Sequence, residues 1–320
     1  MKKILSVILC ISMLPAIVSC NGEAPFDEKP ESPIAESTPA GTPEETPEET
    51  PEETPEETPV ETPEETPSDD TPAELPLRYQ AHRGVSTEFP ENTLPAFQAA
   101  IDQGYKFIEL DPAFTADQKC VIMHDGTINR TCRTADGESI SGDIKINSIT
   151  YDQLMTYDAG LFKNAAFKGT KVPLLSEVAE LVTGTGVALK LDNKMQAFND
   201  AQLEVIFTIA EYSEADIGFT CKTIEFVNKV VKRLPNATIH YDGYIDADVL
   251  NQLEALATDE REIYVWTKID SAKDEYIKKI KEFGYLGIWI LSTEEQLQKA
   301  VELGADVIET NGQLKPPKDA

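Results

Sequence analysis

From about residue 78 onward, short apolar runs alternate with longer amphipathic stretches. Short runs bounded by turn residues are typical of buried strands, and longer stretches with a period near 3.6 are typical of helices packed on one face. The pattern predicts strands at 79–82, 107–110, 187–191, 217–220, 237–241, 262–267, 286–291 and 307–309. It predicts helices between most of them, at 94–103, 175–182, 200–212, 223–234, 247–257, 273–283 and 293–303.

Several predicted helices are followed by glycine, at Gly104, Gly284 and Gly304, and glycine is a common residue just past a helix end. Eight strands alternating with helices over about 240 residues indicate a (β/α)8 TIM barrel. A doubly wound open sheet is the alternative, but no GxGxxG follows the first strand to support it. We therefore expect an α/β domain of the barrel type over residues 76–320.

The first 20 residues, MKKILSVILCISMLPAIVSC, carry two lysines, an apolar stretch and then small residues before Cys20. The stretch is shorter than a membrane span, so the segment is typical of a secretory signal. Its ending resembles a bacterial lipobox, whose cysteine is lipidated, and an ordinary signal peptide is the alternative. We expect a protein anchored to a membrane through Cys20 in a bacterial cell envelope, either periplasmic or exposed at the surface.

Residues 21–75 contain a four-residue TPEE repeat from 42 to 67 with one valine substitution. Proline at every fourth position and repelling glutamates oppose helix and sheet, so we expect a disordered, extended tether. Residues 23–70 hold 18 acidic side chains against one lysine, which accounts for much of the net charge of −29. The remaining chain is also acidic, and this argues against nucleic-acid binding by a basic face.

Three cysteines remain beyond the signal: Cys120, Cys132 and Cys221. An odd number does not indicate a disulfide framework. A bridge between Cys120 and Cys132 is one option that the spacing leaves open.

The first predicted strand ends in His82-Arg83, followed by a glycine and the PENT segment, residues 90–93. Two neighbours that can both be cationic fit poorly in a core strand and suggest an anionic ligand. In a barrel the active site lies at the carboxyl ends of the strands, which is where this pair falls.

The second predicted strand runs into Glu109 and Asp111, which lie two positions apart and therefore share a face. Two carboxylates this close need a cation or a shared proton. Oxygen ligands favour a hard divalent ion, Mg²⁺ or Ca²⁺. A solvated strand end without a metal is the alternative.

Further polar residues end other apolar runs. The run CVIM ends in His124-Asp125, and the preceding TADQK is a turn that returns His124 to the same rim. Asp192 and Lys194 share a face at the end of the next strand. Three acids for a metal, two basic side chains for an anion and two histidines for proton transfer suit cleavage of a phosphate ester.

Together these motifs resemble the glycerophosphodiester phosphodiesterases, which are PI-PLC-like TIM-barrel phosphodiesterases. The resemblance covers roughly residues 79–313. It rests on HRG, PENT, ELD, the HD ending and the following NRT, and later on SITYDQLMTYDAG, KVPLLSEV and GADVIETN.

The resemblance implies a barrel with a small insertion after the second strand, here about residues 126–171. It implies general acid and base roles for His82 and His124, phosphate binding by Arg83, and a divalent ion on Glu109 and Asp111. The products would be glycerol 3-phosphate and an alcohol.

The chain departs from the family at the third strand, where Glu-x-Lys is replaced by Asp192-Asn193-Lys194. The aspartate is one methylene shorter, so it reaches the ion either directly or through water. Another register would put Ala188 and Lys190 at the two family positions. We prefer Asp192 and Lys194, because this register keeps a carboxylate and a lysine at the strand end.

Five other residues are candidates of less defined role. Trp289, in GIWILS, is either a substrate wall or a packing residue, and the family's closing Thr-Asp is Thr310-Asn311 here. Glu91 of PENT lies near the site or organises its loop. His240 lies outside the motifs and is interpreted as structural or incidental.

We expect metal-dependent hydrolysis of glycerophosphodiesters by two-histidine catalysis, with either water or the glycerol 2-hydroxyl as the nucleophile. One alternative is a phosphodiesterase or phospholipase that acts on membrane lipids. Another is a non-catalytic binding lipoprotein on the same barrel. Retention of both histidines and of the acids argues against the last alternative.

Overall fold

The computed structural model describes residues 76–318. The expected signal peptide, Cys20 and the tether lie outside the described residues. No helix in the described part of the chain is long and apolar enough to cross a membrane.

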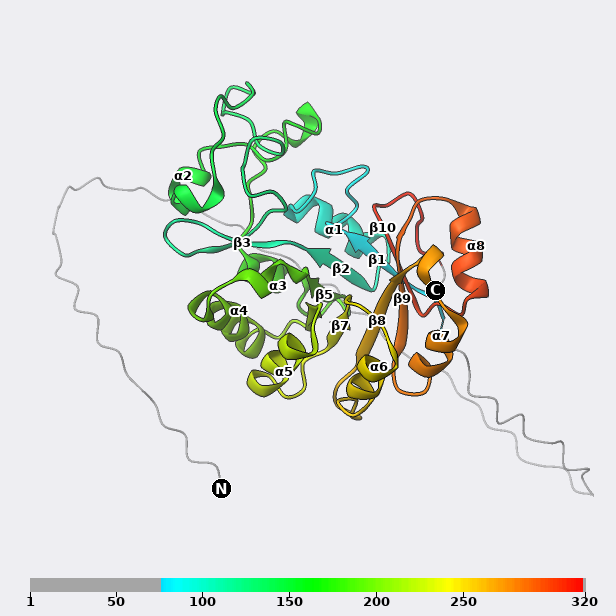
Figure 1. The fold of residues 1–320 in the computed structure, drawn as a ribbon. Coiled ribbons are helices and arrows are strands. Elements are labelled where there is room, and N and C mark those ends of the chain that lie inside the picture. The colour runs from blue at the N-terminus through cyan, green and yellow to red at the C-terminus, as the bar shows by residue number, and fades with distance from the viewer. Residues whose placement is uncertain (1–75, 319–320) are drawn as a thin grey trace, which may run out of the picture. The chain divides into compact units, whose positions relative to one another are not determined.

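Eight parallel strands close into a barrel in the order β1-β10-β9-β8-β7-β6-β5-β2, with helices around it (Figure 1). This confirms the expected (β/α)8 barrel and excludes the open sheet. The barrel strands are β1 Arg78–His82, β2 Phe107–Leu110, β5 Ala188–Leu191, β6 Ile217–Cys221, β7 Ile239–Tyr241, β8 Ile263–Lys268, β9 Tyr285–Leu291 and β10 Val307–Thr310.

The helices that follow the strands agree with the apolar pattern to within a few residues at each end. They are α1 Leu94–Asp102, α3 Leu175–Val182, α4 Asp200–Tyr212, α5 Ile224–Arg233, α6 Ala247–Glu254, α7 Asp274–Ile280 and α8 Glu294–Glu302. Their ends are marked by local chemistry: Asn199 and Thr293, for example, each form a capping box at the start of α4 and α8.

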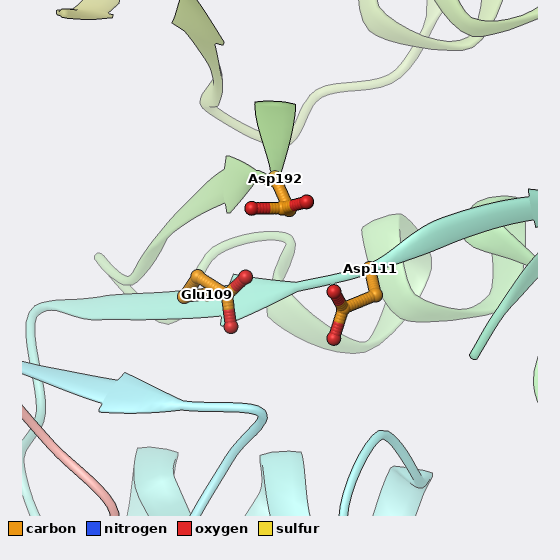
Figure 2. A group of neighbouring side chains, drawn as sticks. All are labelled: Glu109, Asp111 and Asp192. Carbon is orange, nitrogen blue, oxygen red and sulfur yellow. The ribbon is translucent and has the colours of Figure 1, made fainter. Parts of the chain in front are cut away.

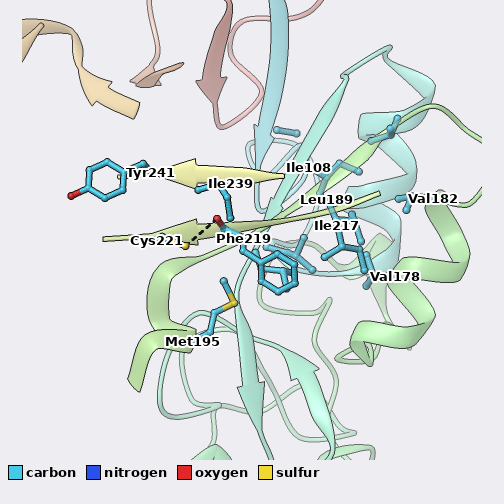
Figure 3. Packing of buried hydrophobic residues seen from close by; sticks show 14 of the residues in the cluster. Ile108, Val178, Val182, Leu189, Met195, Ile217, Phe219, Cys221, Ile239 and Tyr241 are labelled. Carbon is cyan, nitrogen blue, oxygen red and sulfur yellow. Dashed lines mark hydrogen bonds between the residues drawn. The ribbon is translucent and has the colours of Figure 1, made fainter. Parts of the chain in front are cut away.

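The core lies between the barrel and its helices. Leu189 of β5 and Phe219 of β6 are fully buried, and Val178 and Val182 of α3 belong to the same cluster (Figure 3). Alternate residues of these strands point outward into this layer. The residues between them therefore point into the barrel interior.

The barrel interior contains polar groups as well. Lys190 Nζ lies 3.1 Å from Glu309 Oε2 and 3.6 Å from the centre of the Trp266 ring. His240 Nδ1 accepts a hydrogen bond of 3.0 Å from Trp266 Nε1. Burial lowers the pKa of His240 well below its usual value, so this imidazole is neutral. Lys190 lies inside the barrel, level with Glu109 in the register of β5 and β2, and its charge is paired with Glu309.

The insertion after β2 begins earlier than the expected residue 126. β3 Pro112–Phe114 and β4 Cys120–Ile122 form an antiparallel hairpin directly after β2. The segment continues through the 3-10 helix η1 Ile146–Ser148, the short helix α2 Tyr151–Leu154 and the 3-10 helix η2 Ala165–Phe167. The other 3-10 helices are η3 Asn193–Ala197 and η4 Ile269–Ser271.

The insertion has a small core of its own, which includes Ile128, Cys132 and Leu154. The Cys120–Cys132 bridge is wrong, because both thiols are free and buried. Burial raises the pKa of each thiol to about 12, so both remain protonated at neutral pH.

Candidate active site

The loop after β1 turns sharply at the mouth of the barrel. Arg83 has φ 60° and Gly84 has φ 76°. A Cβ atom on Gly84 would lie 2.7 Å from the Cβ of Ala96, so this turn requires glycine. The turn places His82 and Arg83 at the mouth, where His82 Nδ1 lies 2.6 Å from Asn311 Oδ1 at the end of β10.

Glu109, Asp111 and Asp192 converge at the carboxyl ends of β2 and β5 (Figure 2). One ligand atom from each lies within 4.8 Å of the others, and the first two side chains are buried. Burial, followed by the charges of Asp111, Glu309 and Asp192, raises the pKa of Glu109 well above its usual value. A divalent cation offsets this repulsion, and three carboxylates are the donor set of a hard ion, so these residues fit a metal site.

Positive groups surround Asp111. Lys194 Nζ lies 2.6 Å from Asp111 Oδ1 and also donates to the backbone oxygen of His124 at 2.6 Å. Arg83 Nε lies 3.3 Å from Asp111 Oδ2, which also accepts from Asn92 Nδ2 at 2.8 Å. The two basic side chains expected to bind phosphate therefore lie beside the carboxylate cluster.

A chain of ion pairs joins the second histidine to Arg83. His124 Nδ1 lies 2.7 Å from Asp125 Oδ1, and Arg130 Nε donates to Asp125 Oδ2 at 2.6 Å. Arg130 also donates to both oxygens of Glu91 at 2.8 Å, and Arg83 Nη1 donates to Glu91 Oε1 at 3.0 Å. One arginine of the insertion thus orients partners of both His124 and Arg83.

The network keeps both acids ionised. The hydrogen bond from Arg130 lowers the pKa of Asp125 to about 2. Burial alone would raise the pKa of Glu91, but the hydrogen bonds and charges of Arg130 and Arg83 outweigh it and lower that pKa to about 2.

Trp289 lies on β9, while the carboxylates lie at the ends of β2 and β5. Its Nε1 donates to Asp242 Oδ1 at 3.0 Å, and Lys268 Nζ lies 5.0 Å from the ring centre. The ring lines a separate cavity of about 370 Å³ that Tyr244 also lines. Within residues 76–318, no hydrogen bond or ion pair joins Trp289 to the carboxylate cluster.

Three site residues had no assigned role from the sequence: Arg130, Lys163 and Asn311. Arg130 belongs to the NRT motif, and Asn311 stands where the family has aspartate, so both carried a signal. Lys163 carried none, because only the fold of the insertion brings it next to the loop after β1, where its Nζ donates to the Ser86 oxygen at 2.8 Å.

A carboxylate cluster, two cations and two oriented histidines at the mouth of a (β/α)8 barrel define a phosphodiesterase type of site. The sequence profile of the glycerophosphoryl diester phosphodiesterase family matches residues 82–239. The chain belongs to this family, as its motifs indicated, and is a phosphodiesterase by that membership.

Two relatives match over nearly their full length. One is an uncharacterized protein, YqiK, of Bacillus subtilis, at 27% identity over 71% of this chain and 91% of its own. The other is a glycerophosphodiester phosphodiesterase of Caldanaerobacter subterraneus, at 25% identity over 72% and 92%.

Solved structures share the fold. A putative glycerophosphoryl diester phosphodiesterase from Silicibacter pomeroyi is similar with a TM-score of 0.63 at 18% identity, over 75% of this chain and 91% of its own. An Oleispira antarctica phosphodiesterase, in complex with the product sn-glycerol-3-phosphate, has a TM-score of 0.61 at 23% identity, over 75% and 94%.

Proposed function

We propose that the protein hydrolyses glycerophosphodiesters to sn-glycerol 3-phosphate and an alcohol. The observation that carries the proposal is the convergence of Glu109, Asp111 and Asp192 beside Arg83 and Lys194. His82 Nε2 lies 3.9 Å from Glu109 Oε2, and the backbone oxygen of His124 accepts a hydrogen bond from Lys194. The relatives named as glycerophosphodiester phosphodiesterases and the product bound by the Oleispira protein support this substrate class.

Glu109, Asp111 and Asp192 would hold a divalent ion, Ca²⁺ or Mg²⁺. When bound, the ion would supply positive charge that polarises the phosphoryl group. Arg83 and Lys194 bind phosphoryl oxygens and neutralise charge that develops on them, and the planar fork of Arg83 suits two oxygens at once.

The two histidines move the protons. One ring nitrogen accepts the proton of the attacking hydroxyl as its oxygen bonds to phosphorus. The other donates a proton to the alcohol oxygen as the phosphorus–oxygen ester bond breaks. If water attacks directly, the two histidines return to their starting protonation states by proton exchange with solvent. If the 2-hydroxyl attacks, they return when water opens the cyclic phosphate with the acid and base roles reversed. The Nδ1 contacts with Asn311 and Asp125 leave Nε2 of each ring available for this transfer.

The test is release of glycerol 3-phosphate from glycerophosphocholine, glycerophosphoglycerol and glycerophosphoserine by the full-length protein. Activity is measured with Ca²⁺, with Mg²⁺ and with chelator, beside His82→Ala and His124→Ala. We expect metal-dependent release that falls at least ~100-fold in each variant, the lower range for losing an acid or base. Unchanged activity in His82→Ala or in His124→Ala would contradict two-histidine catalysis.

A substrate analogue decides the nucleophile. A diester that lacks the glycerol 2-hydroxyl is still hydrolysed if water attacks directly. It is inert if the 2-hydroxyl attacks first to form a cyclic phosphate.

A second candidate substrate is a lysophospholipid. A mouse relative named lysophospholipase D is 32% identical over 126 residues, but the match spans 38% of that protein. Tyr244, which is 78% exposed beside the cavity at Trp289, is an apolar group that an acyl chain would contact. Faster release of the alcohol from lysophosphatidylcholine than from glycerophosphocholine would favour this candidate.

We further propose that Cys20 carries lipid and that residues 21–75 tether the barrel to a bacterial membrane. The lipobox-like ending of the first 20 residues supports this. Cys20→Ser should move the protein from the membrane fraction to the soluble fraction of the expressing bacterium. Retention of the variant on the membrane would contradict the anchor.

A further inference from the structure

A polar cavity of about 420 Å³ opens at the ends of β1 and β10, directly beside His82 and Arg83. Three segments far apart in the chain form its wall. They contribute Ser86 and Thr87 from the loop after β1, Asn311 and Gln313 from the end of β10, and Lys163 from the insertion.

Lys163 brings a positive charge that no acid in the described part of the chain neutralises. Its Nζ donates to the backbone oxygen of Ser86 at 2.8 Å, which uses one of its three hydrogens. Within residues 76–318, no carboxylate lies within ion-pair distance of Lys163. The one acid in the wall, Glu91, is bound by Arg83 and Arg130.

The wall offers more hydrogen-bond donors than acceptors. In the described part of the chain, nothing pairs with the Thr87 hydroxyl, the Asn311 amide nitrogen or the Gln313 amide nitrogen. Asn311 Oδ1 is bonded to His82, and Gln313 Oε1 accepts from Thr310. A ligand that fills this cavity therefore satisfies the wall best if it presents oxygen acceptors.

The cavity adjoins the catalytic site, because His82 and Arg83 belong to its wall. A phosphodiester bound at the mouth beside His82 and Arg83 would have two ester arms, and the arm on the side of Ser86 and Asn311 would enter this cavity. The glycerol arm is common to all substrates of the proposed reaction, so selection among them depends on where the other arm lies.

We propose that this cavity binds the alcohol head group of the diester and that Lys163 selects head groups bearing carboxylate or hydroxyl oxygens. This inference rests on the proposed function. A quaternary ammonium is disfavoured, because it meets the charges of Lys163 and Arg83. The described residues of the wall also include no Trp, Tyr or Phe ring to receive such a cation.

The experiment measures kcat/KM of the full-length protein for glycerophosphoserine, glycerophosphoglycerol and glycerophosphocholine. We expect the first two to exceed glycerophosphocholine by ~10-fold or more, which is the range for a hydrogen bond to a charged group. Lys163→Met should lower that ratio toward 1, because kcat/KM falls for the first two diesters and rises for glycerophosphocholine. The rate with glycerophosphoserine tests recognition of a head-group carboxylate, and the rate with glycerophosphoglycerol tests recognition of head-group hydroxyls.

Matched variants separate selection from folding. Lys163→Arg keeps the charge and should keep the preference. Lys168→Met removes an exposed lysine of the same insertion and should change nothing. Thr87→Val removes one wall donor without removing Lys163 and should lower the ratio ~3-fold, the effect of a neutral hydrogen bond.

Two outcomes overturn the inference while the proposed function stands. One is a wild-type protein that hydrolyses all three diesters equally well. The other is an equal reduction of kcat/KM for all three diesters in Lys163→Met, which would place the glycerol group that the substrates share in the cavity. Hydrolysis of none of the diesters would reject the proposed function itself, and this inference with it.

Discussion

The two histidines of the site are oriented by partners of different charge. His124 Nδ1 faces the carboxylate of Asp125 at 2.7 Å, and His82 Nδ1 faces the neutral amide of Asn311 at 2.6 Å. A hydrogen bond at one ring nitrogen fixes which nitrogen remains for proton transfer. The partner of each histidine is therefore as important as the histidine, although neither partner needs to touch substrate.

Asn311 is the simpler of the two partners to test. Asn311→Leu removes the acceptor at His82 Nδ1, so the ring loses its fixed orientation and kcat should fall ~100-fold for all diesters, the cost of misplacing a catalytic group. Asn311→Asp retains an acceptor and should keep most of the activity. Steady-state kinetics of both variants check this, and a fully active Asn311→Leu would contradict it.

Arg130 acts through two acids at once. Arg130→Ala should lower kcat/KM roughly 10- to 100-fold, the range for residues that orient a catalytic side chain. Arg130→Lys restores the charge without the planar fork and should recover only part of the loss. The matched control is Arg233→Ala on α5, since Arg233 also bridges two glutamates, Glu204 and Glu211, but lies on a surface helix.

The titration of the Asp125 carboxyl distinguishes this role from a merely structural one. In the wild type the pKa of Asp125 is lowered to about 2, so the carboxylate that holds His124 persists as pH falls toward that value. Without Arg130 this pKa returns toward 3.8, and the contribution of Asp125 is lost at a higher pH. The pKa of the Asp125 carboxyl, followed by NMR titration, should therefore rise in Arg130→Ala, and an unchanged pKa would contradict the assignment.

The insertion depends on one buried acid. Asp158 accepts hydrogen bonds from the backbone nitrogens of Gly160 and Leu161 at 2.8 Å and of Gly169 at 2.6 Å. These bonds close the loop that carries Lys163 to the mouth. The position of Lys163 is thus a property of the whole loop rather than of one contact.

Asp158→Ala leaves three backbone donors without a partner and should lower the free energy of unfolding by about 1–3 kcal/mol. Urea unfolding measures this, and limited proteolysis should detect earlier cleavage within residues 158–170. Asp136→Ala, an exposed acid of the same insertion, is the control and should show neither effect. Equal stability of the two variants would show that the loop is held by other contacts.

Metal binding should stabilise the whole barrel, because the three carboxylates come from two strands and repel one another. At an ion concentration 100 times its Kd, the free energy of unfolding should rise by about 2.7 kcal/mol, and chelator should reverse this. Thermal unfolding in Ca²⁺, Mg²⁺ and chelator gives the measurement independently of activity. Asp192→Asn should reduce the shift, and Asp248→Asn on α6 should not; an unchanged shift in Asp192→Asn would remove Asp192 from the metal ligands.

The amino-acid sequence by itself determined the barrel and most of the residues at its mouth. Helix and strand periodicities are local, so the eight strands and seven of the helices could be read from spacing alone. The carboxyl ends of parallel strands meet at one rim, and this brought His82, Glu109 and Asp192 together in the prediction. The family motifs supplied the remaining roles.

Only the tertiary structure decided the contacts that depend on long-range closure. The turn at TADQK was predicted, but the pairing of β3 with β4 and the start of the insertion were missed, because pairing between strands of three residues leaves little signal in a single sequence. The free state of Cys120 and Cys132 also depends on the packing of the insertion. Lys163 contacts Ser86 across 77 positions of sequence because the insertion folds against the loop after β1. Asn311 contacts His82 across 229 positions because the barrel closes β10 onto β1. No local sequence pattern encodes such long-range contacts, because they form only once distant segments of the chain have come together.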